Sequence, residues 1–507
     1  MSDSPGHAPT TLLDLFRSVP GDRTAVIVPE QNIRVTYSGL RNQVEAAAEA
    51  LGAAGVKRND RVGIAVPNSL STIVCFLAAS MAGTAAPLNP GYKEDEFRFY
   101  LDDTSARVLI LPPDGLEEAR RAAGDTVKIL TVEMDSAGTV RLSATGRGPS
   151  ASAPAVDDVA LILHTSGSTG RPKRVPLTHA NLSISSRNVA GTYGLTADDV
   201  SMCVMPLFHV HGLVASTLAT LATGGTVVVP GKFNPLSFWR VARDYHATWY
   251  SAVPTIHQLL VARAERGSTR PAGAEQLRFI RSCSASLAPQ LMHDLEAAFG
   301  APVLEAYGMT EAAHQMASNP LPPAARKPGS VGQGTGVGIS IMDGEGRHLK
   351  TGERGEVVIK GGNVIRGYEN NPEANATSFA DGWFRTGDQG YLDPDGYLTL
   401  VARIKELINR GGEKVSPREI DEVLLAHPSV AEAVSFGVPH PTWGEEVAAA
   451  VVLSEPISES DLLAYCRDRL ADFKRPKQIH ITETIPRTAT GKIQRRLVAQ
   501  TFTRKAS

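Results

Sequence analysis

Short apolar runs alternate with stretches of helical periodicity over the first half of the chain. Continuous apolar runs bounded by turn residues predict buried strands at residues 61–66, 84–88, 107–111 and 159–163. An Ala-rich segment at residues 41–51 and a periodic segment at residues 69–82 predict helices between them. Strands that alternate with helices in this way are typical of an α/β fold.

The pattern changes after residue 328, where short strands separated by turns replace the alternation. Such strands are predicted at residues 355–360, 382–388 and 396–401, and residues 384–388 read as a turn. These features predict a small β-barrel-like unit at the end of the first domain.

A domain boundary is predicted at residues 402–405. Beyond it, Ser416, Pro417 and Glu419 predict a helix that begins with a capping box, followed by a strand, a helix and a strand. We therefore expect two domains, an N-terminal one at residues 1–402 and a small α+β one at residues 403–507.

Composition and charge narrow the functional classes. The 507 residues carry 51 Lys and Arg against 53 Asp and Glu, and this balance provides no basic field for nucleic acid. Four widely spaced cysteines without a C-x-x-C pair argue against a disulfide framework or a zinc site.

The uncharged stretch at residues 212–231 contains threonines and a Gly-Gly turn, so it predicts a buried helix and a strand rather than a membrane span. Without a signal pattern at residues 1–9, we expect a cytoplasmic protein that has no nucleic-acid, membrane or obligatory protein partner.

The predicted strand at residues 159–163 continues into a segment rich in hydroxyls and glycine that ends in a lysine. Backbone N–H groups can approach phosphate oxygens closely where glycine has no Cβ. The segment lacks the G-x-x-x-x-G-K-[ST] pattern, and Pro172 disfavours a helix at Arg171, so we expect a mobile loop that closes over a polyphosphate. The candidate phosphate-binding residues are Thr165, Ser166, Gly167, Ser168, Thr169, Gly170 and Lys173.

Further candidate chemistry lies in the second half of the chain. In residues 305–311, Tyr307 could stack on a purine, while Thr310 and Glu311 could hold phosphate and Mg²⁺, which prefers oxygen ligands. The carboxylate of Asp388 could accept hydrogen bonds from both ribose hydroxyls. The remaining candidates are cations at the predicted domain boundary and near the C-terminus, namely Arg403, Lys405 and Lys492.

Five segments resemble, in their order and spacing, those of the adenylate-forming superfamily, which includes acyl-CoA synthetases, adenylation domains and luciferases. They are residues 165–173, 305–311, 384–388, 403–405 and 488–496. The resemblance covers essentially the whole chain. It implies a large N-terminal domain of two doubly wound sheets plus a small β-barrel, followed by a small mobile α+β C-terminal domain. It also implies Mg²⁺ as cofactor, with ATP and CoA as co-substrates.

The resemblance implies a nucleotide site. The loop at residues 165–173 and Thr310 would bind the ATP phosphates, Glu311 would bind Mg²⁺, and Tyr307 would bind adenine. The residues that would bind the ribose are Asp388 and Arg403.

The resemblance also implies two half-reactions. In the first, a carboxylate attacks the α-phosphorus of ATP while Lys492 bridges the two anions. In the second, CoA displaces AMP after the small domain rotates about a hinge at Lys405. Gly411, Gly412 and Glu413 would then line the tunnel that admits the pantetheine arm.

A narrower resemblance, to the oxalate–CoA ligases of plants and fungi, is found in residues 206–212, 278–289, 307–322, 404–414 and 491–496. It would place His211, Ser284 and His314 around the substrate. A two-carbon diacid carries a second carboxylate that is costly to bury without hydrogen-bond donors, which histidines and a hydroxyl supply. Arg281 stays open between a role in anion binding and a structural ion pair.

Oxalate–CoA ligase is the first hypothesis, and others stay open. A ligase for malonate or another short carboxylate is the second, and a module that loads an acid onto a carrier protein is the third. A non-catalytic nucleotide sensor is disfavoured by the phosphate loop together with Glu311 and Lys492. The last three residues, 505–507, do not form the peroxisomal address that the plant and fungal enzymes often carry, which favours the cytoplasm.

Overall fold

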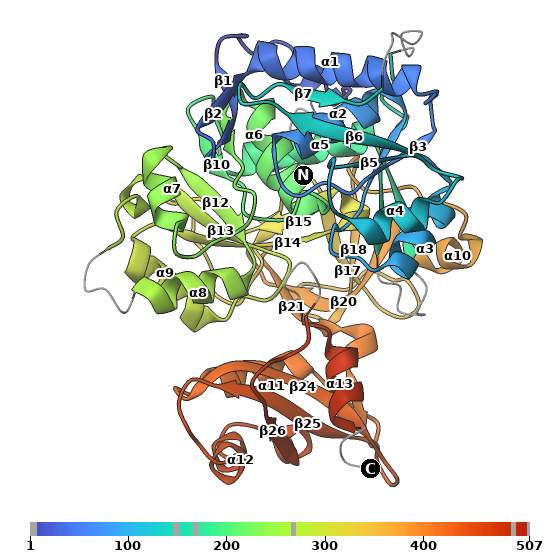
Figure 1. Ribbon diagram of the computed structural model, residues 1–507. Coiled ribbons are helices and arrows are strands. Elements are labelled where there is room, and N and C mark those ends of the chain that lie inside the picture. Colours follow the sequence, from blue (N-terminus) through green and yellow to red (C-terminus); the bar gives the residue numbers. More distant parts are fainter. Residues whose placement is uncertain (1–7, 145–152, 166–171, 265–269, 488–492, 504–507) are drawn as a thin grey trace.

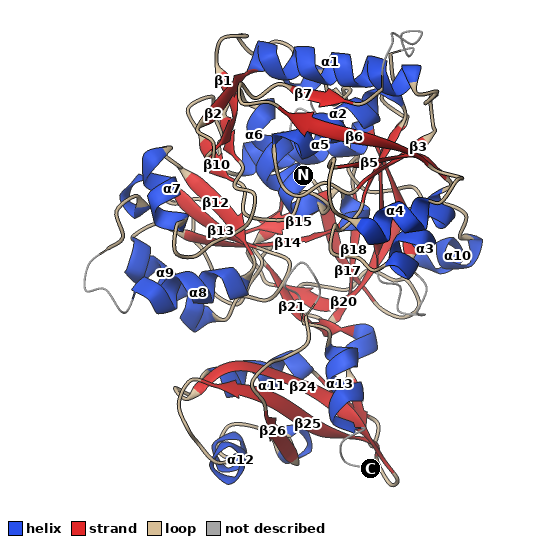
Figure 2. Cartoon of the chain, in the orientation of Figure 1, coloured by secondary structure: helices blue, strands red, loops and turns tan. Residues whose placement is uncertain are grey.

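The chain forms a large N-terminal lobe and a smaller C-terminal lobe that are connected after residue 403 (Figure 1). The computed structural model describes residues 8–144, 153–165, 172–264, 270–487 and 493–503. Both lobes combine helices and strands (Figure 2). None of the helices within these ranges is long and apolar enough to cross a membrane.

A seven-stranded sheet carries the strands that flank the predicted phosphate loop. Its strands, in sheet order, are β7 (Val140–Leu142), β6 (Lys128–Met134), β5 (Ala106–Leu111), β3 (Arg61–Ile64), β4 (Thr84–Pro87), β8 (Val159–Thr165) and β9 (Lys173–Thr178). The five central strands are parallel, and the two edge strands are antiparallel. On β5, Val108 and Ile110 join one apolar core while Leu109 and Leu111 join another, because successive side chains face opposite sides of a sheet. The four strands predicted in this region are confirmed.

A nine-stranded sheet forms the other half of the large lobe. Its strands, in sheet order, are β16 (Gln333–Gly334), β15 (His314–Ser318), β14 (Val303–Met309), β13 (Phe279–Ser282), β12 (Trp249–Ala252), β10 (Val200–Met202), β11 (Thr226–Val228), β1 (Thr24–Val28) and β2 (Ile33–Thr36). The strands from β14 to β1 are parallel, whereas β2, β15 and β16 pair antiparallel. Two large sheets with parallel centres are the arrangement that was predicted.

Helices cover both faces of these sheets (Figure 1). The α-helices of the large lobe are α1 (Tyr37–Ala53), α2 (Leu70–Ala82), α3 (Glu94–Thr104), α4 (Glu117–Ala123), α5 (His179–Thr192), α6 (Ala219–Ala222), α7 (Phe238–Asp244), α8 (Pro254–Ala264), α9 (Pro289–Phe299) and α10 (Pro372–Ser378). α2 and α5 each contact strands of both sheets, so they lie between them. α3 and α4 pack on the far side of the seven-stranded sheet, and α7, α8 and α9 pack on the far side of the other.

A third sheet, with antiparallel pairing, lies next to the small lobe. Its strands are β17 (Gly338–Met342), β18 (Gly355–Lys360), β19 (Phe379–Ala380), β20 (Trp383–Leu392) and β21 (Leu398–Arg403). Among the described strands, the first and last strands of this sheet do not pair with each other. The region therefore forms an open sheet and not the small β-barrel that was predicted. The turn predicted at residues 384–388 is wrong, because β20 continues through it while pairing with both β18 and β21.

The small lobe packs its helices on a mostly antiparallel sheet. Its strands are β22 (Ile408–Arg410), β23 (Glu413–Val415), β24 (Val430–His440), β25 (Gly444–Leu453) and β26 (Gln478–Ile481). Its helices are α11 (Pro417–Leu425), α12 (Glu459–Arg467) and α13 (Arg495–Thr503). Short 3₁₀ turns in the two lobes are Asp14–Phe16, Ala274–Gln276, Thr310–Ala312, Ile404–Glu406 and Asp472–Lys474.

Helix α11 begins where it was predicted, but the capping box is wrong. Ser416 precedes the helix, yet its hydroxyl donates to the carbonyl of Val401 at 2.7 Å and does not cap the helix. Glu419 pairs with Lys474 at 2.7 Å. A serine hydroxyl can satisfy either a helix end or a distant carbonyl, and here it ties the small lobe to β21.

Candidate active site

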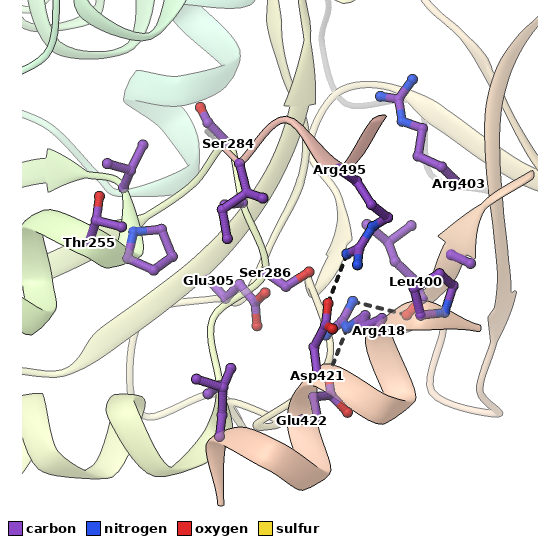
Figure 3. A pocket seen from close by; sticks show the side chains of 18 of the residues that line it. Thr255, Ser284, Ser286, Glu305, Leu400, Arg403, Arg418, Asp421, Glu422 and Arg495 are labelled. Carbon is purple, nitrogen blue, oxygen red and sulfur yellow. Dashed lines mark hydrogen bonds and ion pairs between the residues drawn. The ribbon is translucent and has the colours of Figure 1, made fainter. Parts of the chain in front are cut away.

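A cavity of about 310 Å³ lies between the two lobes (Figure 3). The large lobe contributes Ser284, Tyr307 and Asp388 to its lining, and the small lobe contributes charged residues of α11. One of these, Asp421, pairs with Arg495 of α13 at 2.8 Å. A ligand in this cavity would therefore contact both lobes.

Three predicted nucleotide-binding residues meet in the cavity. Asp388 and Arg403 face each other across β20 and β21, and the Arg403 Nε lies 2.8 Å from the Asp388 Oδ1. The buried Tyr307 hydroxyl donates to the Asp388 Oδ2. Burial and the neighbouring Asp388 carboxylate raise the pKa of Tyr307 well above its usual value, so the phenol stays protonated. An aromatic ring, a carboxylate and a guanidinium thus converge from separate segments of the sequence.

Glu305 lines the same cavity and was not among the predicted site residues. Its Oε1 accepts from the Leu287 N–H at 3.0 Å, whereas its buried Oε2 has no hydrogen-bond partner among the described residues. Burial raises the pKa of Glu305 to about 7. A glutamate inside the otherwise apolar start of β14 was the signal that could have found it. The free oxygen can accept a hydrogen bond from a ligand.

The predicted phosphate end of the site also assembles. Thr165 and Lys173 face each other at the ends of β8 and β9, and the Lys173 Nζ lies 4.4 Å from the centroid of the Tyr368 ring. The Tyr368 hydroxyl donates to the Glu311 Oε1 at 2.8 Å. Burial lowers the pKa of Lys173, while the Glu311 carboxylate opposes this shift and Lys405 adds to it. Ser166, Gly167, Ser168, Thr169 and Gly170 lie outside the described residues.

The three predicted acid-binding residues form a cluster beside the cavity, in which His211 and His314 are buried and Ser284 is half-buried. The His211 Nδ1 lies 3.0 Å from the Ser284 Oγ, and the rings of His211 and His314 meet edge to face with centroids 5.1 Å apart. His211 begins the π-helix His211–Leu218, and irregular helices of this kind are frequent at functional sites. Gly212 is needed there, because a Cβ would lie 2.4 Å from the Pro206 carbonyl oxygen.

His314 has an unusual environment for a buried histidine. Neither of its ring nitrogens has a hydrogen-bond partner among the described residues, although its side chain is 2% exposed. Its backbone φ is +116°, a conformation that is costly for a residue with a side chain and is often found at functional sites. Burial, followed by the nearby Arg281, lowers the pKa of His314 well below 6.5, so the ring is neutral. The neutral ring carries one N–H, and this donor has no acceptor among the described residues.

Arg281 completes this cluster. Its Nη1 lies 3.4 Å from the His211 Nε2 and donates to the Ser251 Oγ at 2.8 Å. The hypothesis of a structural ion pair is wrong, because the described part of the chain offers this guanidinium no carboxylate within ion-pair distance.

Some predicted residues do not lie in the cavity. Gly411 and Gly412 form the turn between β22 and β23 with positive φ, and neither they nor Glu413 line it. Lys405 lies in the 3₁₀ turn that connects the lobes, and Lys492 lies outside the described residues. The hinge, tunnel and lysine roles stay predictions, as do the nucleotide, metal and acid-binding roles of the other residues.

The donors near the phosphate end fit magnesium. Glu311 offers a buried carboxylate, and the described residues contain no group of three or more His, Cys, Asp or Glu side chains that could hold a metal alone. Mg²⁺ commonly takes one or two protein carboxylates and completes its shell with water and substrate phosphates. The residues present are therefore suited to a metal that arrives with a nucleotide.

The fold and the site define the class of protein. A family model of AMP-binding enzymes matches residues 16–369, and a model of the AMP-binding enzyme C-terminal domain matches residues 419–492. The chain belongs to the AMP-binding enzyme family.

Individual relatives match over nearly the full length. An oxalate–CoA ligase from Arabidopsis thaliana is 48% identical, with 96% of each chain covered. An oxalate–CoA ligase from Saccharomyces cerevisiae is 44% identical, again with 96% of each chain covered. Among solved structures, ATP-bound MatB from Rhodopseudomonas palustris is similar with a TM-score of 0.90 and 30% identity, covering 99% of this chain and 100% of MatB.

Proposed function

We propose that the chain is an ATP-dependent acid–thiol ligase that makes oxalyl-CoA from oxalate, ATP and CoA, and releases AMP and pyrophosphate. The observation that carries this proposal is the cluster of His211, Ser284 and His314 beside the cavity in which the predicted nucleotide-binding residues meet. Buried and half-buried donors suit a small acid with a second negative charge, because they lie next to a guanidinium that has no carboxylate partner among the described residues. They do not suit an apolar chain. The similarity to two oxalate–CoA ligases supports the same substrate.

In the first half-reaction, a carboxylate oxygen of the acid attacks the α-phosphorus of ATP. A new P–O bond forms, the bond to the bridging oxygen breaks, and pyrophosphate leaves with its electron pair. The protein mainly positions the reactants and neutralises charge. Lys173 would neutralise phosphate charge, and Lys492 would bridge the carboxylate and the α-phosphate.

The nucleoside would be held by the residues that meet in the cavity. Asp388 would accept from the ribose hydroxyls, with Arg403 beside it, and Tyr307 would contact the adenine ring. The free Oε2 of Glu305 would accept from the exocyclic amine of adenine, which is a donor of the right kind for an unpartnered carboxyl oxygen.

Magnesium would be held through Glu311, with Thr310 contributing to phosphate binding. When bound, the ion would supply charge neutralisation on the phosphate oxygens.

In the second half-reaction, the CoA thiolate attacks the acyl carbon, an S–C bond forms, and the C–O bond to AMP breaks. The small lobe would rotate about Lys405 so that Gly411, Gly412 and Glu413 reach the thiol's path. Because residues of both lobes line the cavity, such a rotation would change which small-lobe residues face the ligand.

The test is oxalate-dependent exchange of labelled pyrophosphate into ATP, followed by mass spectrometry of the CoA product. We expect exchange that requires Mg²⁺, and oxalyl-CoA once CoA is added. The Lys492→Ala protein should lose exchange by about 10²–10³-fold, the usual cost of one transition-state stabiliser. Transfer to a phosphopantetheine carrier protein but not to free CoA would contradict the proposal and favour a carrier-loading module.

A further inference from the structure

Arg281 is completely buried on β13, and it forms no ion pair within the described ranges. A guanidinium stays charged in a protein, and burying a charge without a counter-charge is costly. Arg278, three residues earlier, shows the ordinary solution, since its Nη1 pairs with the Asp199 Oδ1 at 2.6 Å. A bound anionic ligand can therefore supply the counter-charge that Arg281 lacks among the described residues.

The hydrogen bonds of Arg281 all go to uncharged groups. Its Nε donates to the Tyr193 hydroxyl at 2.8 Å, its Nη2 donates to the Gln315 Oε1 at 3.0 Å, and its Nη1 donates to the Ser251 Oγ at 2.8 Å. Arg281 and Ser251 face each other in the register of β12 and β13, and Gln315 follows His314 on β15. One side chain thus connects the strands on which the acid-binding cluster is built.

A guanidinium has only donors, so it fixes the direction of the hydrogen bonds beyond it. Ser251 accepts from Arg281, and the Arg281 Nη1 also lies 3.4 Å from the His211 Nε2, so this nitrogen faces a group that can only donate and is itself an acceptor. Ser251 therefore donates its own proton to the His211 Nε2, which lies 2.6 Å away. Burial, followed by Arg281, lowers the pKa of His211 well below 6.5, so the ring is neutral and carries its single proton on Nδ1. That proton goes to the Ser284 Oγ at 3.0 Å.

The chain of hydrogen bonds ends at the cavity. Ser284 already accepts from His211, so its own hydroxyl proton must be donated elsewhere, and no acceptor for it occurs among the described residues. Its backbone φ of +73° is a further mark of a constrained position. Ser284 lines the cavity (Figure 3), so its hydroxyl is a donor at the edge of the space that a ligand would occupy.

We propose that Arg281 makes the acyl site selective for acids that carry a second negative charge. It acts as a positioning residue that directs the protons along Ser251 and His211 toward Ser284, and as the counter-charge behind them. The inference rests on the proposed function and deepens it, because it names the group that separates a dicarboxylate from a monocarboxylate. An acid without a second charge would leave the guanidinium uncompensated.

The test compares matched acids on the full chain. Oxalate and glyoxylate form one pair, and malonate and propionate form another, so that each pair differs in charge at similar size. For each acid, kcat/KM is measured as CoA-dependent release of AMP. In Arg281→Gln, the ratio of dicarboxylate to monocarboxylate kcat/KM should fall roughly 10- to 100-fold, the cost of losing interactions with a charged group. Arg281→Lys keeps the charge and should restore part of that ratio.

The control is Arg278→Gln, which removes a neighbouring arginine that has its own carboxylate partner. It should lower the Tm and leave the ratio unchanged. If Arg281→Gln does not fold, Arg281→Lys and Ser251→Ala carry the test. Each should lower the ratio below that of the wild type, Arg281→Lys because it keeps the charge but loses the guanidinium fork, and Ser251→Ala because it interrupts the hydrogen-bond chain. An unchanged ratio in the Arg281 variants, or an equal fall in Arg278→Gln, would overturn the inference.

The two proposals fail in different ways. If the wild type prefers malonate to oxalate, the proposed substrate is wrong, while a ratio of malonate to propionate that depends on Arg281 still supports the inference. If the wild type favours neither dicarboxylate over its partner acid, the inference is overturned.

Discussion

His314 is a buried imidazole whose two nitrogens have no partner in the part of the chain that the structure describes, and the proposed function gives this a reason. Replacing it with Ala removes one donor to the distal carboxylate of oxalate. Losing a hydrogen bond to a charged group costs about 1.5–3 kcal/mol, so kcat/KM for oxalate should fall by roughly 10- to 150-fold. Acetate and propionate have no distal charge and should lose far less.

His179 provides the control, because it is buried and hydrogen-bonded to Leu12 and Ser80. His179→Ala should lower stability and leave the ratio between oxalate and acetate unchanged. Equal losses for all acids in His314→Ala would assign this histidine to the shared adenylation chemistry.

Glu305 should make stability depend on pH. Its pKa of about 7 in the folded chain lies above the ordinary value of 4.5, so folding favours the protonated form. Its contribution to the free energy of unfolding is present below pH 4.5 and is lost as the pH rises through 7. Glu305→Gln removes this loss, which amounts to roughly 3 kcal/mol at 1.36 kcal/mol per pKa unit. Without ATP, the variant should have the higher Tm at pH 8.5 and nearly the same Tm at pH 5; a constant difference would contradict the assignment.

At the scale of elements, the pairing of β14 with β15 holds the acid-binding histidine in place. The register of these strands shifts after Tyr307, and a bulge of this kind often redirects a side chain beside an active site. A Cβ on Gly308 would lie 2.2 Å from the His314 carbonyl oxygen. Gly308→Ala should therefore destabilise the fold by about 1–3 kcal/mol, which would be measured as a lower Tm. It should also reduce the activity with oxalate.

Gly191 near the end of α5 is the matched control, because a Cβ added there has no atom within 4 Å apart from its chain neighbours and the backbone of its own helix turn. Gly191→Ala should be neutral or slightly stabilising, since alanine favours a helix. A Gly308→Ala protein with wild-type Tm and activity would show that the close approach of the two strands is not needed.

Regular elements could be predicted from the sequence because their period is local. The apolar runs that became β3, β4, β5 and β8 depend only on neighbouring residues. The turn predicted around Gly387 failed because this residue has a φ of +74° and still lies within β20, where two partner strands keep the chain extended. Ser416 failed similarly, because its acceptor is a carbonyl on another strand.

The candidate site was predictable where its residues stand in contiguous motifs, as Tyr307 and Asp388 do. Arg281 and Glu305 needed the fold. Arg281 meets Ser251 only through the register of β12 and β13, and only the packed interior shows that no carboxylate among the described residues pairs with it. A glutamate at the apolar start of a strand marks Glu305 as unusual in the sequence, but only the fold shows that one of its oxygens is buried and has no partner among the described residues.

At the scale of the whole molecule, the two proposed half-reactions need different positions of the small lobe. Lys405 lies in the turn between β21 and β22, where a change in backbone angles would rotate everything that follows. Lys405→Pro fixes φ at the middle residue of the turn Ile404–Glu406. It should leave oxalate-dependent pyrophosphate exchange nearly unchanged and slow thioester formation from supplied oxalyl-adenylate strongly. Similar slowing of both steps would place the hinge elsewhere.

The measurement that tests the account most directly is the acid preference of the wild-type chain. Purified protein with ATP, Mg²⁺ and CoA is given oxalate, malonate, acetate and acids of six or more carbons in turn, and AMP release is followed with and without CoA. The account predicts the highest kcat/KM for oxalate, a lower value for malonate and almost none for the long acids, because the buried donors suit a short dianion. A higher kcat/KM for a long-chain or singly charged acid than for oxalate would contradict it.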